Sequence, residues 1–314
     1  MQENNVTLIS DVILLGFQNL QNFKSLFFSI FFLIYFATIS GNVLIILLVS
    51  SSKNLHSPMY FFLTHLSLAD ILLSTDIAPQ MLSTVLRGPI TISFTSCISQ
   101  FYFFAVSECS ECLLLSVMSY DRFSAICNPL HYNSVMNSAF CVKLATMSWL
   151  LSFLIILIDT TTIALLQFCG PNVIDHFFCD YPLILELSCS DVFVVQLEVI
   201  FLSFPVLFVP FAIILVSYIC ILRVIFKISS ITGKHKAFST CSSHLTTVSV
   251  FYITLFCIYV LSTGQLLSTS KLLSLFYTVG TPLINPIIYS LRNKDIKESF
   301  RKLMNRAWPL YKTG

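Results

Sequence analysis

The chain has 314 residues, of which 56% are hydrophobic and only 10% are charged, and its mean hydropathy is +0.86. These values exclude an ordinary soluble globular protein, in which about a quarter of the residues are charged. The formal net charge of +2 gives no support to a nucleic-acid partner. The sequence therefore predicts an integral membrane protein.

The amino-terminal tail, residues 1–25, has no basic segment followed by an apolar segment, as a cleaved signal peptide would have. We expect the first membrane helix to serve as its own insertion signal. The tail contains the tripeptide NVT at Asn5–Thr7, which is an acceptor sequence for N-glycosylation. Glycosylation of Asn5 is expected because the tail is predicted below to lie outside the cell.

Seven apolar stretches follow, each long enough to cross a hydrocarbon core of about 30 Å, which needs roughly 20 helical residues. The connections between them are mostly short, and no internal repeat is visible. We therefore expect an all-α membrane protein in which one domain fills residues 1–314, with a helix bundle at 26–291 and a surface helix and tail at 292–314. The predicted spans are residues 27–49, 59–86, 94–126, 144–168, 199–222, 237–262 and 272–291.

Lysine and arginine are distributed unequally between the two sides of these spans. Lys24, Arg87 and Lys271 fall on one side, and the other fourteen of the seventeen basic residues fall on the opposite side. Basic residues favour the cytoplasmic side of membrane proteins. The amino terminus is therefore predicted to be extracellular, on the side that carries most of the acidic residues.

Four of the eleven cysteines are predicted to lie on the extracellular side, where disulfides persist. Cys97 begins the third span, and Cys169, Cys179 and Cys189 lie in the long loop before the fifth. Four cysteines allow two bridges in three connectivities. The other seven are expected to be packing residues, and no cluster has the spacing of a metal site.

Acidic residues inside the predicted spans are the strongest functional signal, because ionisable groups at this depth are costly and usually face a cavity, a partner or the bundle interior. Asp70 lies in the middle of the second span, and Glu108 and Glu111 share one face of the third. These acids are either hydrogen-bonded structural groups or part of a polar centre. In the second case Asp70 and Glu111, with Asn42 and Asn285, would hold a proton or a cation such as sodium.

Prolines interrupt two of the spans, with Pro205 and Pro210 in the fifth and Pro286 in the seventh. Proline removes a backbone hydrogen bond and bends a helix. The sequence leaves open whether these bends are only architectural or act as hinges.

The last span is followed by a segment with apolar residues at helical spacing among basic ones. Ile296, Phe300 and Leu303 share one face of this segment. This pattern predicts a short amphipathic helix that lies on the inner membrane surface.

The motifs, taken together, resemble those of olfactory receptors, a family of rhodopsin-like G-protein-coupled receptors. The resemblance covers nearly the whole chain and implies a plasma-membrane receptor that is not an enzyme and uses no cofactor. The motifs are LLGF at 14–17, GN at 41–42, HSPMYFFL at 56–63, LSLAD at 66–70, ECLLLSVMSYDRFSAICNPLHY at 111–132, SY at 217–218, KAFSTCSSHL at 236–245 and PLINPIIYSLRN at 282–293.

The resemblance implies coupling to a heterotrimeric, stimulatory olfactory-type G protein and a rise in cyclic AMP. In similar receptors the arginine matched by Arg122 meets the carboxy-terminal helix of the G protein, and Asp121 is expected to pair with it at rest. The implied activation residues are completed by Tyr218, Tyr289, Lys236 and His244.

The resemblance also implies an odorant pocket in the outer half of the bundle and two disulfides, Cys97 with Cys179 and Cys169 with Cys189. The implied pocket residues are Phe104, Ala105, Glu108 and Cys109 in the third helix, Leu202 and Val206 in the fifth, Tyr252, Leu255 and Tyr259 in the sixth and Thr278 in the seventh.

The chain departs from the common family pattern at several positions. Ser119 and Phe123 stand where the family usually has Ala and Tyr, and Ile253 replaces a glycine beside a pocket position. Glu108 stands where a small or neutral residue is common. Its charge needs compensation by protonation, by a cation shared with the polar centre, or by a ligand that carries an amine.

Two other functions remain as alternatives. A rhodopsin-like receptor for an amine, a peptide or a pheromone would share the mechanism and differ in its ligand. A channel or transporter would also place acids within a bundle, but such folds typically show inverted repeats, and none is visible here.

Overall fold

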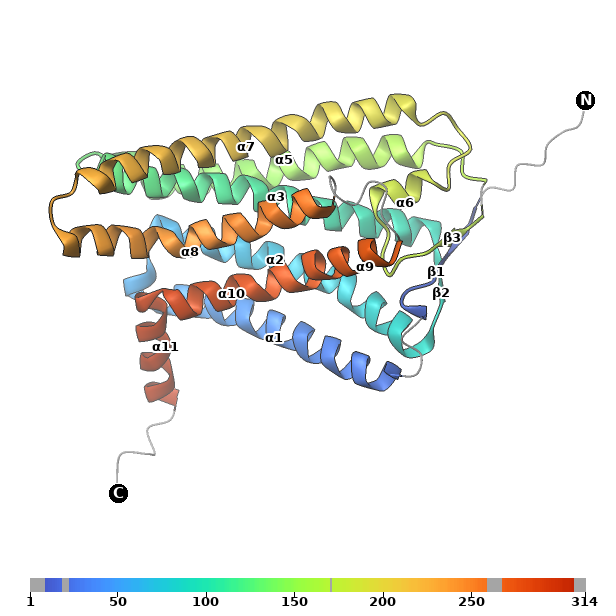
Figure 1. The fold of residues 1–314 in the computed structure, drawn as a ribbon, viewed down its shortest axis with the longest axis horizontal. Coiled ribbons are helices and arrows are strands. Elements are labelled where there is room, and N and C mark those ends of the chain that lie inside the picture. The colour runs from blue at the N-terminus through green and yellow to red at the C-terminus, as the bar shows by residue number, and fades with distance from the viewer. Residues whose placement is uncertain (1–8, 19–22, 170, 259–266, 308–314) are drawn as a thin grey trace, which may run out of the picture.

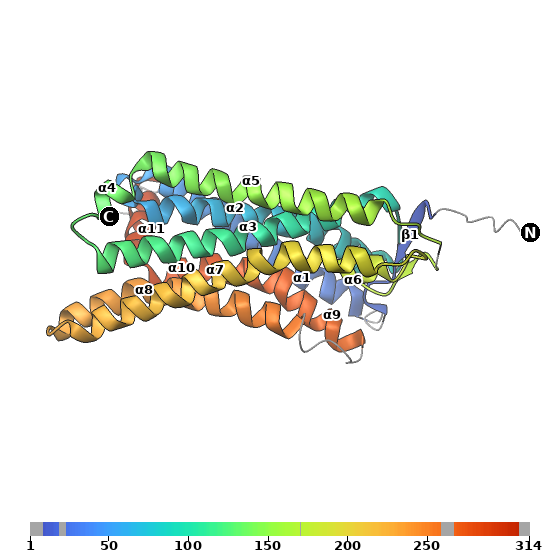
Figure 2. The same cartoon turned by 90° about the horizontal axis from the view of Figure 1, so that it is seen from above.

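The computed structural model describes residues 9–18, 23–169, 171–258 and 267–307. Figure 1 shows an elongated bundle of helices, with the strands near the amino terminus at one end and the last helix at the other. Figure 2 shows the same polarity, since α4 and α11 share one end while β1 and α6 share the opposite end.

Seven helical segments run along the bundle in the described part of the chain. Six of them are long and apolar enough to cross a membrane, and α8 contributes a shorter apolar stretch at Cys241–Phe256. The structure thus confirms the predicted seven-helix bundle. The segments are α1 (Lys24–Ser51), α2 (Pro58–Arg87), α3 (Phe94–Cys127), α5 (Ser138–Ala164), α7 (Phe193–Lys227), α8 (Ile231–Phe256), and a seventh made of α9 (Leu267–Leu275), the π-helical η4 (Phe276–Gly280) and α10 (Thr281–Arg292).

Three short helices connect the long ones: η2 (Lys53–Leu55), α4 (Tyr132–Val135) and α6 (Tyr181–Leu185). The fourth membrane helix, α5, ends at Ala164, whereas the sequence predicted residue 168. The reason is that the next residues pair with the end of the same loop, since the Cys189 amide donates to the Gln167 carbonyl at 2.9 Å and Phe168 forms a bridge with Ser188. Hydropathy alone does not register such pairing.

Large apolar side chains cover the outer surface of the bundle. On α7, for example, Phe201 is 78% exposed and Val194 is 70% exposed. Exposed apolar area of this extent is unfavourable in water and is expected where the solvent is lipid. These outward faces are therefore the lipid-facing surface of the protein.

A small sheet, which the all-α prediction did not include, lies at the end of the bundle near the amino terminus. Strand β1 (Asp11–Leu14) pairs antiparallel with β2 (Ile90–Ser93) and parallel with β3 (Val173–Ile174), in the order β2-β1-β3. Gly16 follows β1 with φ of +59°, and a Cβ there would lie 2.6 Å from the Thr84 Cβ atom. The positive φ and this close approach together account for the glycine in the LLGF motif.

At two of the prolines within the membrane helices, Pro286 and Pro210, a side chain from a neighbouring helix donates to the backbone carbonyl that the proline leaves free. Pro286 cannot donate to the carbonyl of Pro282, which instead accepts from the Asn42 amide at 3.2 Å. Pro210 likewise frees the Val206 carbonyl, and the Cys112 thiol donates to it at 3.2 Å. The bent helices stay continuous because helices α1 and α3 satisfy their backbones.

The last helix, α11 (Lys294–Ala307), turns away from the bundle axis (Figure 1). Asn293 begins it, because its side-chain oxygen accepts from the amides of Asp295 and Ile296 at 3.0 and 3.3 Å. Ile296 is buried against the bundle, whereas Phe300 and Leu303 remain 40% and 37% exposed. This confirms the predicted amphipathic helix, whose exposed apolar face suits the membrane surface.

Candidate functional site

The long loop between α5 and α7 is held over the end of α3. Cys97 is bonded to Cys179 with a Cα–Cα distance of 5.5 Å, and Cys169 is bonded to Cys189 with a Cα–Cα distance of 5.8 Å. The Cys179 amide also donates to the Gln100 side chain at 2.9 Å. These contacts place the residues that follow Cys179 against the helix bundle.

A cavity of about 920 Å³ lies below this loop, between α3, α5, α7, α8 and η4. Its walls are mostly aromatic and aliphatic. A few polar side chains interrupt this apolar lining, and they are Glu108, Asp159, Asp180, Tyr181, Ser203, Tyr218, Ser249, Tyr252 and Tyr277.

Glu108 lies on the cavity wall and is oriented by the seventh helix, since the Tyr277 hydroxyl donates a hydrogen bond to its Oε2 atom. Phe104, one turn earlier on α3, meets Tyr277 edge to face, with ring centroids 6.2 Å apart. Phe104 also packs against Phe178 of the loop, with ring centroids 5.2 Å apart. Aromatic packing therefore holds the groups that fix the Glu108 carboxylate.

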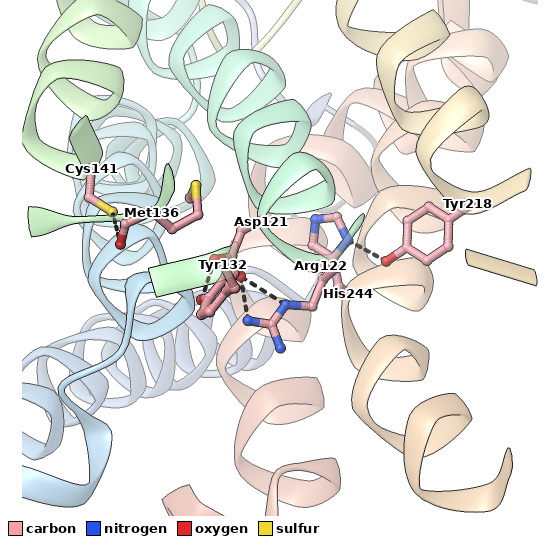
Figure 3. A network of polar contacts seen from close by, with 7 residues as sticks. All are labelled: Asp121, Arg122, Tyr132, Met136, Cys141, Tyr218 and His244. Carbon is pink, nitrogen blue, oxygen red and sulfur yellow. Dashed lines mark hydrogen bonds and ion pairs between the residues drawn. The ribbon is translucent and has the colours of Figure 1, made fainter. Parts of the chain in front are cut away.

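A second polar network lies at the opposite end of α3 (Figure 3). Asp121 is fully buried and accepts hydrogen bonds from the Arg122 guanidinium, with Nε at 2.9 Å, and from the Tyr132 hydroxyl at 2.8 Å. The Arg122 side chain is only 13% exposed. The Asp121 carboxylate therefore holds the Arg122 side chain against the bundle, where little of it is exposed.

Two neighbouring helices are joined beside Arg122 in the same view (Figure 3). The Tyr218 hydroxyl of α7 and Nδ1 of His244 in α8 are 2.6 Å apart, and their rings stack with centroids 5.8 Å apart. Tyr289 of α10 is also buried, with 1% of its surface exposed. Separation of α7 from α8 would break the bond between Tyr218 and His244.

A third group of polar side chains is buried midway along the bundle. The Asn285 amide donates to both Asp70 carboxylate oxygens, at 3.0 and 3.3 Å, and Glu111 is a buried acid close enough to Asp70 to interact with it electrostatically. Asn42 does not join this pair directly, because its amide donates to the carbonyls of Thr38 and Pro282.

Comparison with known proteins assigns this arrangement to a family. The olfactory receptor family model matches residues 31–307. This chain is an olfactory receptor family member. Olfactory receptor 11L1 of Homo sapiens is 44% identical over 98% of this chain and 95% of its own length, and Olfactory receptor 10A4 of Homo sapiens is 45% identical over 98% of each. Olfactory receptor 5M5 of Mus musculus is 43% identical over 98% of this chain and 96% of its own length.

Membership of this family makes the chain a multi-pass signalling receptor of the plasma membrane and not an enzyme. On α3, a helix of 34 residues, the cavity is lined by residues from Phe101 to Cys112, and Arg122 lies near the carboxy-terminal end. Tyr218 of α7 lines the cavity and also bonds His244 beside Arg122.

Most of the expected pocket residues lie together in this receptor. The seven that line the cavity are Phe104, Ala105, Glu108, Cys109, Val206, Tyr252 and Leu255. Tyr259 and the sequon at Asn5 lie outside the described residues, as does the side chain of Lys236.

Two residues of the set implied by resemblance, Leu202 and Thr278, do not line the cavity. Thr278 is buried and donates to the Ser274 carbonyl at 2.8 Å, while its neighbour Tyr277 faces the cavity. Both residues belong to the π-helical η4. On α7, Val199, Ser203 and Val206 form the stripe that faces the cavity, and Leu202 lies beyond its edge.

The resemblance also missed several polar groups of the receptor cavity. Asp159 was visible as a charge inside the fourth span, but nothing in the sequence placed it in the same cavity as Glu108. Asp180 and Tyr181 directly follow Cys179, so the disulfide to α3 is the signal that would have found them. Tyr277 could be found only by knowing where η4 begins.

Proposed function

We propose that this receptor binds a small organic odorant in the cavity and activates a stimulatory G protein, which raises cyclic AMP. The cavity itself carries the proposal. Binding sites for small molecules are typically concave, roughly 300–1,000 Å³ in volume and mostly apolar, with a few polar groups that orient the ligand. The cavity of about 920 Å³ has these properties.

The inner network supports coupling at the opposite membrane face. Arg122 lies fourteen residues after Glu108 on α3, which is about 21 Å along the helix. Ligand and G protein therefore act on different parts of the same helix. Tyr218 links the two regions, because it lines the inner end of the cavity and bonds His244 beside Arg122.

The proposal includes an extracellular amino terminus. Its support is the distribution of charge, since Arg122, Lys143, Arg223 and Lys227 belong to the end of the bundle that carries α11. The end with the disulfide-linked loop instead carries Asp175, Asp180 and Asp191. This distribution follows the tendency of basic residues to remain in the cytoplasm.

Filling the cavity should abolish the response to every agonist. In Val206→Trp the larger side chain occupies ligand space, while the backbone carbonyl that accepts from Cys112 is retained. We expect loss of the odorant-evoked cyclic AMP signal at normal surface expression. The measurement is a cyclic AMP assay on cells with quantified surface receptor.

Val194→Trp is the matched control, because Val194 lies on the same helix and is 70% exposed to the lipid side. It should respond like the wild type. Wild-type agonist potency in Val206→Trp would contradict the assignment of the cavity as the odorant-binding site. A ligand-evoked current in cells that lack the G protein would instead favour the channel alternative.

We also propose that Asp70 and Glu111 share a proton or a sodium ion in the resting receptor. The donor set fits a hard cation, because it consists of oxygen atoms, and the Glu111 Oε1 and Asn285 Oδ1 atoms are buried without a hydrogen-bond partner. A bound cation would hold α2, α3 and α10 together. It would offset the repulsion between the two carboxylates.

Replacing sodium by N-methyl-D-glucamine in the assay buffer should therefore raise basal cyclic AMP. Asp70→Asn should remove this dependence, whereas Asp76→Asn on the same helix should keep it. Sodium dependence that persists unchanged in Asp70→Asn would contradict the cation site.

A further inference from the structure

The acidic groups of the cavity indicate what it binds. We propose that the ligand is a small apolar molecule with a protonated amine, held by the carboxylates of Glu108, Asp159 and Asp180. This inference rests on the proposed function and names the ligand class for the same cavity.

The first observation is a set of acidic groups without cationic partners. Three carboxyl groups line the cavity, and its lining, as far as the structure describes it, contains no lysine, arginine or histidine. Lys271 lies at the outer end of the seventh helix but is paired with Asp175 at 2.5 Å and with the Gly16 carbonyl at 3.0 Å. Buried carboxyl groups of this kind are either protonated or met by a cation, and a ligand with a positive charge would supply that cation.

The second observation is an unsatisfied acceptor aimed into the cavity. Asp159 is 98% buried, with 2% of its surface exposed, and its Oδ1 atom has no hydrogen-bond partner. The Tyr181 hydroxyl beside the cavity is also buried without a partner. Buried polar atoms of this kind are costly unless a ligand or water satisfies them.

The outer acids supply a negative field at the entrance. Burial raises the pKa of Asp180 to about 6, while the Tyr181 amide stabilises its carboxylate, so it is mostly ionised at neutral pH. Burial, with the negative charges of Asp159 and Glu198, raises the pKa of Tyr181 to about 12. The shift at Asp180 reflects its burial, and the shift at Tyr181 fits a region in which acidic groups lie close together.

Glu108 lies on α3 eleven residues, or about 16 Å, after Cys97 and is already oriented by the Tyr277 hydroxyl. A carboxylate accepts several hydrogen bonds, so the Tyr277 hydroxyl positions Glu108 without saturating it. Asp180 lies within electrostatic reach of Glu108. An ammonium group near Glu108 would therefore also be attracted by the outer acids.

The rest of the cavity determines the other part of the ligand. Phe101, Phe104, Phe251, Tyr252 and Leu255 provide aromatic and aliphatic surface. Such a wall favours a hydrocarbon body and disfavours sugars or polar peptides. A volatile alkyl or aryl amine combines the apolar body with the required charge.

The test uses compounds with one carbon skeleton and different head groups. Hexylamine, hexan-1-ol and hexanoic acid form one set, and benzylamine, benzyl alcohol and benzoic acid form another. In the wild-type receptor the amines should raise cyclic AMP at concentrations at least about tenfold lower than the alcohols, because charge-assisted hydrogen bonds to a buried carboxylate are strong. The acids should be inactive.

Glu108→Gln keeps the shape of the side chain and removes its charge. It should lower amine potency by about tenfold or more and leave any alcohol response unchanged. Asp159→Asn and Asp180→Asn should act in the same direction, and they provide the comparison if Glu108→Gln fails to reach the cell surface. Asp191→Asn is the control, because Asp191 is an exposed loop acid outside the cavity lining, and an asparagine oxygen can accept the same hydrogen bond from the Phe193 amide.

A second readout does not depend on the G protein. The melting temperature of the purified receptor should rise with hexylamine or benzylamine, should not rise with the alcohols, and should lose this shift in Glu108→Gln. Amines that neither raise cyclic AMP nor shift melting overturn the inference, as do alcohols that match the amines. If alcohols act and Val206→Trp abolishes their action, the proposed function stands and the amine inference fails. If amines shift melting and no compound raises cyclic AMP, the ligand inference stands and the proposed coupling fails.

Discussion

Arg122→Ala will abolish the cyclic AMP response while leaving ligand affinity at surface-expressed receptor largely unchanged. The guanidinium is held by Asp121 at the inner end of α3, about 21 Å along the helix from Glu108. Its removal therefore does not touch the cavity. It removes the cation that we expect to meet the G protein when α7 and α8 separate.

The measurement pairs a cyclic AMP assay with agonist binding to the same cells. Binding should change by less than about threefold, whereas the cyclic AMP signal should disappear. Lys143→Ala is the matched control, because Lys143 is an exposed basic residue near the same end of the bundle. An Arg122→Ala receptor that signals like the wild type would contradict the assignment of the inner network.

The helices of this receptor could be predicted because crossing a membrane imposes a length and an apolar surface that hydropathy measures directly. Their ends were harder to place. The fourth helix was predicted to continue to residue 168, but backbone pairing of Gln167 and Phe168 with Cys189 and Ser188 ends it at Ala164. The outer sheet was missed for the same reason, because β1 pairs with strands that are distant in the sequence.

The ligand-binding role of the candidate residues stays a prediction, and the structure shows only where they lie. Phe104, Ala105 and Glu108 line the same cavity, on the helix α3 that continues without interruption from Phe94 to Cys127. On the seventh helix Tyr277, and not Thr278, lies at the cavity wall, within the π-helical turn η4. A difference of one residue along the helix decides whether the side chain reaches Glu108, which the Tyr277 hydroxyl does.

The three acidic residues of the cavity come from distant parts of the sequence, and only the fold brings them together. Glu108 and Asp159 were each visible as costly charges inside spans, but the sequence does not state that both line one cavity. Asp180 joins them only because the Cys97–Cys179 disulfide brings a loop of distant sequence to α3. The disulfide therefore matters to the proposed ligand site as well as to stability.

Breaking this disulfide with Cys97→Ser will lower surface expression strongly and remove the agonist response of the receptor that remains. The bond closes a segment of 82 residues, and disulfides of this kind typically stabilise a fold by about 2 to 4 kcal/mol. That is a large share of a typical stability of about 5 to 15 kcal/mol. Without the bond, the loop that positions Asp180 and Tyr181 keeps only noncovalent contacts with α3, such as the hydrogen bond from Cys179 to Gln100 and the packing of Phe178 on Phe104.

The measurement combines surface staining, the melting temperature of purified receptor and peptide mapping without reduction. Cys169→Ser should have a smaller effect on melting, because its bond to Cys189 closes only 20 residues and constrains the unfolded chain less. Cys220→Ser, at a free cysteine within α7, should behave like the wild type. Mapping that finds Cys97 unlinked, or linked to Cys169 or Cys189, would contradict the pairing. In that case Asp180 would lose the contact that places it in the cavity, and the amine would have to be held by Glu108 and Asp159 alone.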